Sequence, residues 1–164
     1  MTTSVVHYDD ILEYNAHNLY GISKAIMKNI ALNLALNNMP FILTHSTFSG
    51  SGAHTAHWIG DNVATWDDLW YSIPTMFSFG LFGFPMVGVD ICGFSQDTTE
   101  DVCNRWIQLV SFYHFSRDHS IKGSKHQEIY LWDSVTRSVN KALGLRYKLL
   151  PYIYTLSFEA HTKK

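Results

Sequence analysis

The sequence predicts an α/β fold in which a parallel β-sheet is flanked by helices. Residues 41–44 and 85–92 are short apolar runs bounded by Pro, Gly and small polar residues, which is typical of strands buried on both faces. Amphipathic helical segments lie before, between and after these runs. Alternation of this kind produces βα units, and therefore parallel strands.

The N-terminal part contains one predicted helix, one strand and a long loop. Residues 18–36 carry apolar side chains at helical spacing, and Pro40 follows soon after them. Residues 41–44 then form the first strand. The segment 45–60 is rich in Ser, Thr, Gly and His, so it is predicted to be an irregular loop with no core of its own. Loops that follow parallel strands carry the chemistry in such folds.

The sequence of the middle of the chain predicts a second helix and a second strand. The helix covers residues 66–79, where Asp67 and Asp68 suit the positive N-terminal end of a helix. Residues 85–92 form the strand, and Asp90 interrupts its otherwise apolar run.

The C-terminal part is predicted to be mainly helical. A third helix runs from Thr98 to about residue 112, and a polar stretch follows at residues 116–128. Two further helices are expected, one over residues 129–140 and a longer one starting near Gly144.

The composition excludes some classes of protein. Lys and Arg total 12 against 14 Asp and Glu, a formal charge of −2, which argues against a nucleic-acid-binding surface. Disorder is excluded by 46% hydrophobic and only 16% charged residues. The 15% of aromatic residues suits either a large core or a site that stacks on sugars, and both remain open.

No targeting or membrane segment is expected. The first ten residues contain neither a basic stretch nor an apolar core, so they do not resemble a signal peptide. Residues 73–94 are apolar, but Pro and Gly divide them into pieces too short to cross a bilayer as one helix.

Two carboxylates are the candidates for catalysis. Asp61 follows Trp58, whose indole lowers the local polarity, and Asp90 lies in an apolar strand, where an unpaired carboxylate is costly. Paired carboxylates between aromatic walls suit the hydrolysis of glycosides. The alternative is structural: Asp61 caps the helix entered at Trp66, and backbone donors satisfy Asp90.

Metal, cofactor and nucleophilic-serine chemistry find little support. His54, His57 and Asp61 have a helical spacing, but their segment is rich in Gly, and no zinc motif occurs. A G-x-S-x-G elbow and nucleotide-binding glycine motifs are also absent, so neither a metal nor a cofactor is expected. Cys92 and Cys103 are either two free buried thiols or a disulfide bridge.

Several longer motifs resemble glycoside hydrolase family 31, the α-glucosidases and α-xylosidases. They occur in the family's order and extend over nearly the whole chain: HWIGDN at 57–62, GFPMVG at 83–88, DICGF at 90–94 and FSRDH at 115–119. The sequences of the motifs are most similar to those of plant members of the family.

The resemblance implies a (β/α)₈ TIM barrel and a retaining mechanism that uses two aspartates. Asp61 would be the general acid/base. The subsite for the terminal sugar would be lined by Trp58, Asp90, Phe94 and His119. Cys92 and Cys103 match a family disulfide. His45 stands where the family has a substrate-binding Arg.

The resemblance also implies that the chain is incomplete as an active site. Residues 1–164 would be the C-terminal half of the catalytic barrel, and the motif that carries the nucleophile is not among them. We therefore expect an α-linked oligosaccharide or glycoside as substrate, but no activity from this chain alone. The alternative is a non-catalytic remnant that binds sugar weakly or packs against protein, with self-association through exposed half-barrel edges. The parent enzyme would be secreted, vacuolar or elsewhere in the secretory pathway.

Overall fold

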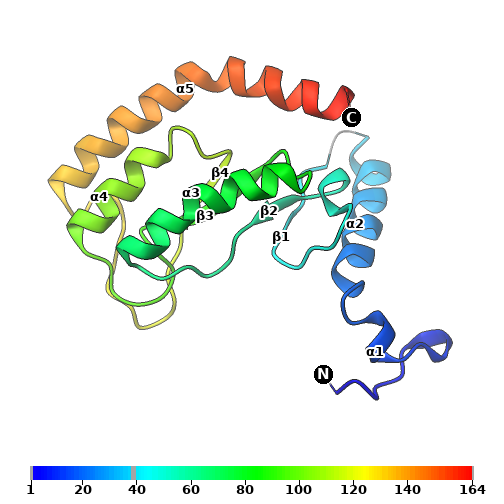
Figure 1. The fold of residues 1–164 in the computed structure, drawn as a ribbon. Helices are drawn as coiled ribbons and strands as arrows, with labels where there is room; N and C mark the ends of the chain where they lie inside the picture. Colours follow the sequence, from blue (N-terminus) through cyan, green and yellow to red (C-terminus); the bar gives the residue numbers. More distant parts are fainter. Residues whose placement is uncertain (1, 38–39, 164) are drawn as a thin grey trace. The chain divides into compact units, whose positions relative to one another are not determined.

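The structure is a computed structural model that describes residues 2–37 and 40–163. Its four strands, labelled in Figure 1, are Leu43–Thr44 (β1), Ala56–Trp58 (β2), Val87–Ile91 (β3) and Phe115–Asp118 (β4). Their order in the sheet is β1-β2-β3-β4. The pairs β1–β2 and β3–β4 are both parallel. The predicted α/β fold with a parallel, helix-flanked sheet is confirmed.

The chain divides into two compact units, and the first comprises Met1–His57 with Phe82–Phe84. It contains a 3₁₀ turn (η1, Tyr8–Asp10), α1 (Glu13–Ala16), α2 (Tyr20–Leu36), a second 3₁₀ turn (η2, Ser51–Ala53) and β1. Helix α2 matches the predicted helix closely. It ends at Asn37, which adopts a left-handed conformation (φ 47°) and donates its N–H to the Asn33 carbonyl at 3.1 Å.

Strand β2 lies in the segment that was predicted to be an irregular loop, and that prediction was wrong. The Ala56 N–H donates to the Ile42 carbonyl at 2.8 Å, and His57 lies opposite Thr44 in the β1 register. Three residues that include a histidine give no hydrophobic pattern, so pairing with β1 creates this strand. Strand β1 itself is shorter than expected.

The second unit, Trp58–Leu81 with Pro85–Lys164, holds the remaining helices. They are α3 (Trp66–Leu81), α4 (Glu100–Leu109) and α5 (Asp133–Thr162). Helix α3 begins where predicted. Helix α4 is shorter than predicted at both ends. The Thr99 hydroxyl accepts from the Val102 N–H and so sets its start.

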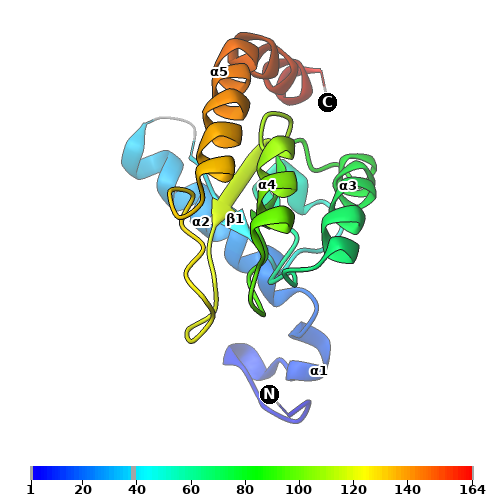
Figure 2. The ribbon, with the colours of Figure 1, turned by 90° about the vertical axis from the view of Figure 1, so that its left-hand side faces the viewer.

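Helix α5 is a single helix where the sequence predicted two. Gly144 lies inside it, in the helix that runs without a break from Asp133 to Thr162. Pro151 also lies inside the helix. The first part of α5 lies beside α4 (Figures 1 and 2), and the buried Ser111 hydroxyl donates to the Ala142 carbonyl at 2.8 Å.

The core of the second unit lies where β3, α4 and α5 meet. Its fully buried side chains include Val89, Trp106, Ile107 and Val135. A core on this face holds β3 in place and leaves the carboxyl ends of the strands free to carry polar side chains.

A disulfide joins Cys92, directly after β3, to Cys103 in α4. Their Cα atoms are 4.3 Å apart, so the predicted pairing is confirmed. Cys92 (φ 67°) and Gly93 (φ 93°) form a sharp turn after β3. A Cβ at Gly93 would lie 2.3 Å from the Ala64 Cα, so both the conformation and the close approach require glycine.

None of the helices in the described part of the chain is both long and apolar enough to cross a membrane. The apolar residues 73–94 belong largely to α3 and β3, as their interruption by Pro and Gly predicted.

Candidate active site

The candidate residues of the second unit gather where β2, β3 and β4 end. Trp58 is the last residue of β2, Asp90 lies near the end of β3, and His119 directly follows β4. Parallel strands place their carboxyl ends at one edge of the sheet, where barrel enzymes have their active sites.

Asn62 ties the segment that carries Asp61 to this same edge. Its side-chain Nδ2 donates to the backbone carbonyl of Asp90 at 2.9 Å, and its backbone carbonyl accepts from the Phe94 N–H at 2.8 Å. Asp61, one residue before Asn62, is exposed to solvent. The segments that follow β2 and β3 are therefore bound to each other, which places Asp61 and Asp90 at the same end of the strands.

Capping does not explain Asp61. The side chain that receives a helical N–H at the start of α3 is Thr65, whose hydroxyl accepts from Asp68 at 3.2 Å. Asp68 in turn accepts from the Val63 N–H. These two residues serve the N-terminus of α3, so the carboxylate of Asp61 is available for another role.

Arg117 lies in the FSRDH motif, but it was given no role of its own on the sequence alone. It lies opposite Asp90 in the β3–β4 register, and its Nε and Nη2 donate to Asp90 Oδ1 and Oδ2 at 2.8 and 3.3 Å. The guanidinium also lies 4.7 Å from the centroid of the Trp58 ring. The sequence feature that could have indicated a role for Arg117 is its two-residue spacing from His119, because alternate residues of a strand share a face.

The Asp90–Arg117 pair has one fully buried partner. The Asp90 side chain is 0% exposed and that of Arg117 is 35% exposed. A two-point guanidinium–carboxylate contact is the strong form of ion pair, because two charge-assisted hydrogen bonds act together. Arg117, and not backbone donors, therefore satisfies the Asp90 carboxylate.

Phe94 and His119 form an aromatic wall at this edge. Their ring centroids are 4.8 Å apart with an interplanar angle of 35°. Phe94 is half-buried and His119 is exposed, so the pair presents both an apolar face and a polar ring edge to solvent. This combination suits contact with a sugar, which has apolar faces and hydroxyl edges.

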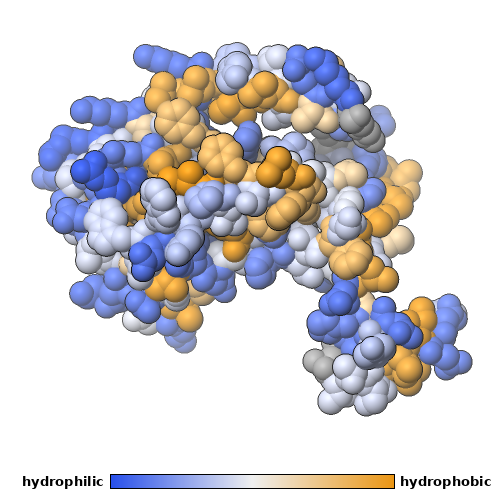
Figure 3. Space-filling view, in the orientation of Figure 1, coloured by the Kyte–Doolittle hydropathy of each residue, from blue (hydrophilic) through white to orange (hydrophobic). Residues whose placement is uncertain are grey.

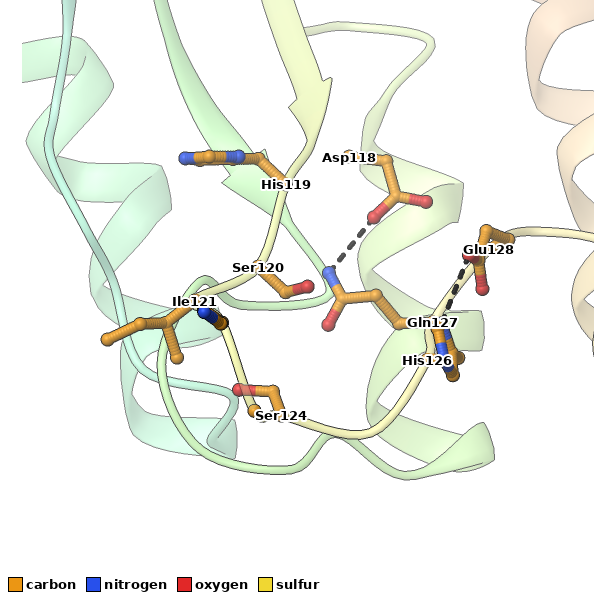
Figure 4. Close-up of a pocket in the computed structure, with 10 residues that line it drawn as sticks. Asp118, His119, Ser120, Ile121, Ser124, His126, Gln127 and Glu128 are labelled. Atoms are coloured by element: carbon orange, nitrogen blue, oxygen red, sulfur yellow. Dashed lines mark hydrogen bonds and ion pairs between the residues drawn. The ribbon is translucent and has the colours of Figure 1, made fainter.

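A pocket of about 400 Å³ opens beside the end of β4 (Figure 4). Its lining includes Asp118, His119, Gln127 and Glu128. Burial of its carboxyl raises the pKa of Asp118, and the charges of Glu128 and Asp90 add to this, whereas a hydrogen bond from Gln127 lowers it. Figure 4 shows the side chains of Asp118 and His119 pointing to opposite sides of the strand end.

His45 belongs to the first unit, where it follows β1. Its ring stacks on that of His57 with centroids 6.2 Å apart. Burial lowers the pKa of His57 to about 4, and the charge of His45 adds to this effect, against a hydrogen bond with the Thr44 backbone. His57 is therefore neutral at pH 7.

The stability of the chain is expected to fall as the pH is lowered through the range set by His57. The pKa of His57 is about 4 in the folded chain and 6.5 in the unfolded chain, so the unfolded state binds more protons between these two pH values. The free energy of unfolding should drop by about 2–3 kcal/mol across this range. His114, whose pKa is lowered by burial and by Arg146, acts in the same direction. Asp118, with its raised pKa, acts in the opposite direction.

Urea unfolding of the wild type and of a His57→Phe variant between about pH 4.5 and 7 measures this effect. The variant keeps a ring beside Phe84 but cannot titrate, so its stability should change less with pH. Equal pH slopes for the two proteins would show that His57 is not buried in its neutral form.

Within residues 2–37 and 40–163, no group of three or more His, Cys, Asp or Glu side chains is arranged to hold a metal ion.

A sequence profile of the glycosyl hydrolases family 31 TIM-barrel domain matches residues 1–156. The chain belongs to glycosyl hydrolase family 31. The resemblance based on the motifs is thereby confirmed, and with it the assignment of the parallel sheet to part of a TIM barrel.

Members of family 31 from plants are similar over nearly the whole chain. An alpha-glucosidase of Hordeum vulgare is 58% identical over 156 residues, or 95% of this chain, and alpha-xylosidase 1 of Arabidopsis thaliana is 53% identical over 161 residues, or 98%. The chain spans 18% of the length of each of these relatives.

Solved structures of family 31 show the same backbone. The glucosidase II alpha subunit in a Glc1Man2-bound form superposes with a TM-score of 0.87 at 35% identity, covering 98% of this chain and 18% of that one.

Proposed function

We propose that this chain forms part of an active site that hydrolyses α-glucosides or α-xylosides with retention of configuration. The observation that carries this proposal is the collection of Asp61, the Asp90–Arg117 pair and the Phe94–His119 wall at one edge of the parallel sheet. Relatives named alpha-glucosidase and alpha-xylosidase support the class of substrate.

Asp61 is the proposed general acid/base. As the acid it protonates the glycosidic oxygen while the leaving group departs, and it then deprotonates the water that attacks the glycosyl-enzyme intermediate. Its exposed carboxyl at the strand ends can reach both a leaving group and a water molecule. This reaction class needs neither a metal nor an organic cofactor.

The remaining residues hold the sugar in this proposal. Trp58 and Phe94 provide apolar faces, and the His119 ring and the Arg117 guanidinium provide polar contacts to hydroxyls. Asp90 is fully buried, so it acts chiefly by fixing the Arg117 guanidinium beside the Trp58 ring. His45, in the other unit, stands where the family places a guanidinium.

We further propose that residues 1–164 supply only half of the site. A retaining glycosidase needs a second carboxylate about 5–5.5 Å from the first, free to attack the anomeric carbon. Asp90 does not meet this need, because both of its oxygens bind Arg117 and its side chain has no exposed surface. The chain then corresponds to the C-terminal half of a catalytic barrel.

Exposed apolar surface supports a second role, packing against further protein. Figure 3 shows apolar side chains gathered over α3, where Phe77 and Leu81 are 74% and 87% exposed. Exposed apolar surfaces of this kind mark interfaces with other protein.

We propose that the isolated chain self-associates through the exposed apolar surface over α3. Sedimentation velocity at increasing concentration tests this, and a monomer at every concentration would contradict it.

The sugar site can be tested in this chain by NMR titration with methyl α-glucoside and methyl α-xyloside. The Trp58 indole and the Phe94 amide should shift most, and mannitol should leave them unchanged. Trp58→Ala should abolish the response, whereas Trp66→Ala, a matched loss of an exposed indole on α3, should not. Shifts that survive Trp58→Ala would refute the proposed site.

A further inference from the structure

Gln127 lies in the segment between β4 and α5, and its side-chain amide joins the ends of two strands. It is 4% exposed. Its Nε2 lies 3.1 Å from the Gly93 carbonyl, 3.5 Å from the Ile91 carbonyl and 2.9 Å from Asp118 Oδ1. Figure 4 shows the Gln127 side chain reaching toward Asp118 from the opposite wall of the pocket.

The chemistry of these neighbours fixes the orientation of the amide. All three partners are oxygen atoms that accept hydrogen bonds, so the NH₂ group must face them. The reverse orientation would put Oε1 against three oxygens. In the observed orientation Oε1 is buried and has no hydrogen-bond partner within the described part of the chain. An unpaired buried carbonyl is unfavourable, so the contacts of the NH₂ group are what hold the side chain in this orientation.

The three acceptors flank the residues that form the aromatic wall. Ile91 and Gly93 enclose the turn that leads into Phe94, and Asp118 directly precedes His119. Ile91 and Asp118 are also the last pair in the β3–β4 register. Gln127 thus continues the connection between the two strands beyond the point where backbone pairing ends.

A second contact between the same segments acts alongside Gln127. The Ile121 N–H donates to the Phe94 carbonyl at 2.9 Å. This contact involves only backbone atoms, and it lies between His119 and Gln127 in the sequence. The segment 118–127 is therefore held to the 91–94 turn at two places, Ile121 and Gln127, and Gln127 also contacts Asp118, the residue directly before His119.

We propose that Gln127 is a positioning residue that sets the spacing between Phe94 and His119, and through it the shape of the sugar subsite. The effect on sugar binding rests on the proposed function, whereas the effect on the ring spacing does not. Without the amide, the turn after β3 and the end of β4 separate, and the 4.8 Å contact between the two rings loosens.

The experiment compares the wild type with Gln127→Met, which keeps the length of the side chain but removes both donors. Gln108→Met makes the same chemical change at an exposed position of α4 and is the matched control. Three quantities are measured: nuclear Overhauser effects between the Phe94 and His119 rings, the affinity for methyl α-glucoside, and the urea midpoint. Gln127→Met should weaken the ring contact and reduce the affinity about tenfold, since small displacements of binding groups have effects of this size. Gln108→Met should change neither.

Asp118 provides a second pair of variants, decisive if Gln127→Met does not fold. Asp118→Asn keeps an acceptor for Gln127 and should behave as the wild type, whereas Asp118→Leu removes it and should weaken the ring contact. A lower urea midpoint with an unchanged ring contact in Gln127→Met or Asp118→Leu would overturn the proposal and leave Gln127 a purely structural residue. If no variant, including the wild type, binds the sugar while the ring contact changes as expected, the proposed function fails and the positioning role stands.

Discussion

Replacing Arg117 with Met is expected to lower the free energy of unfolding by about 3–5 kcal/mol, because it leaves a buried carboxylate without its partner. The Asp90 side chain is 0% exposed and receives two hydrogen bonds from the guanidinium. Methionine fills much of the same space but offers no donor. Urea unfolding at pH 7 measures the effect.

Two controls separate this loss from a general effect of removing an arginine. Arg105→Met removes an exposed guanidinium from α4 that donates a 3.5 Å hydrogen bond to the Gln108 side chain, and it should change stability by less than about 0.5 kcal/mol. The double variant Asp90→Leu with Arg117→Met removes both charges and should recover much of the lost stability. A loss below about 1 kcal/mol for Arg117→Met would show that the pair is not buried as described.

The second large effect concerns catalysis: these 164 residues alone should hydrolyse neither an aryl α-glucoside nor an aryl α-xyloside. A retaining mechanism requires a nucleophilic carboxylate, and Asp90 is held by Arg117. The lost step is the formation of the glycosyl-enzyme bond, for which a general acid cannot substitute. In the proposed site, where the motif resemblance puts His45 in place of an Arg, we also expect the loss of a charge-assisted contact of a kind typically worth about 1.5–3 kcal/mol.

The elements that could be predicted from the sequence are those whose hydrophobic pattern extends over several turns or a buried run. Helix α2 and strand β3 fall in this class, and α3 begins at the predicted residue. Strand β2 could not be predicted, because its three residues are defined by pairing with β1 and not by their own composition. The single α5 was missed because Gly144 and Pro151 weaken helix propensity locally, while packing against α4 holds the helix together.

For the site, too, residues in local motifs could be predicted from the sequence, whereas residues that depend on tertiary contacts could not. Asp61, Asp90 and His119 were proposed as site residues from motifs, and the disulfide was predicted from its match to the family. Neither Arg117 nor Gln127 was given a role from the sequence, because each makes its contacts with residues far along the chain, Asp90 at 27 positions and Gly93 at 34. Such pairs form only when β3 and β4 lie side by side, and one sequence gives no sign of that register.

The most direct measurement is a hydrolysis assay on the purified chain with both aryl glycosides, run beside an Asp61→Asn variant. The same sample must first show a dispersed NMR spectrum and the sugar-induced shift of the Trp58 indole, so that a negative result comes from folded, sugar-binding protein. If the chain carries the acid/base and the sugar contacts but not the nucleophile, neither protein will release the aryl group faster than buffer does. Release by the wild type that disappears in Asp61→Asn would mean that a working nucleophile lies within these 164 residues, and would contradict the assignment of this chain as half of an active site.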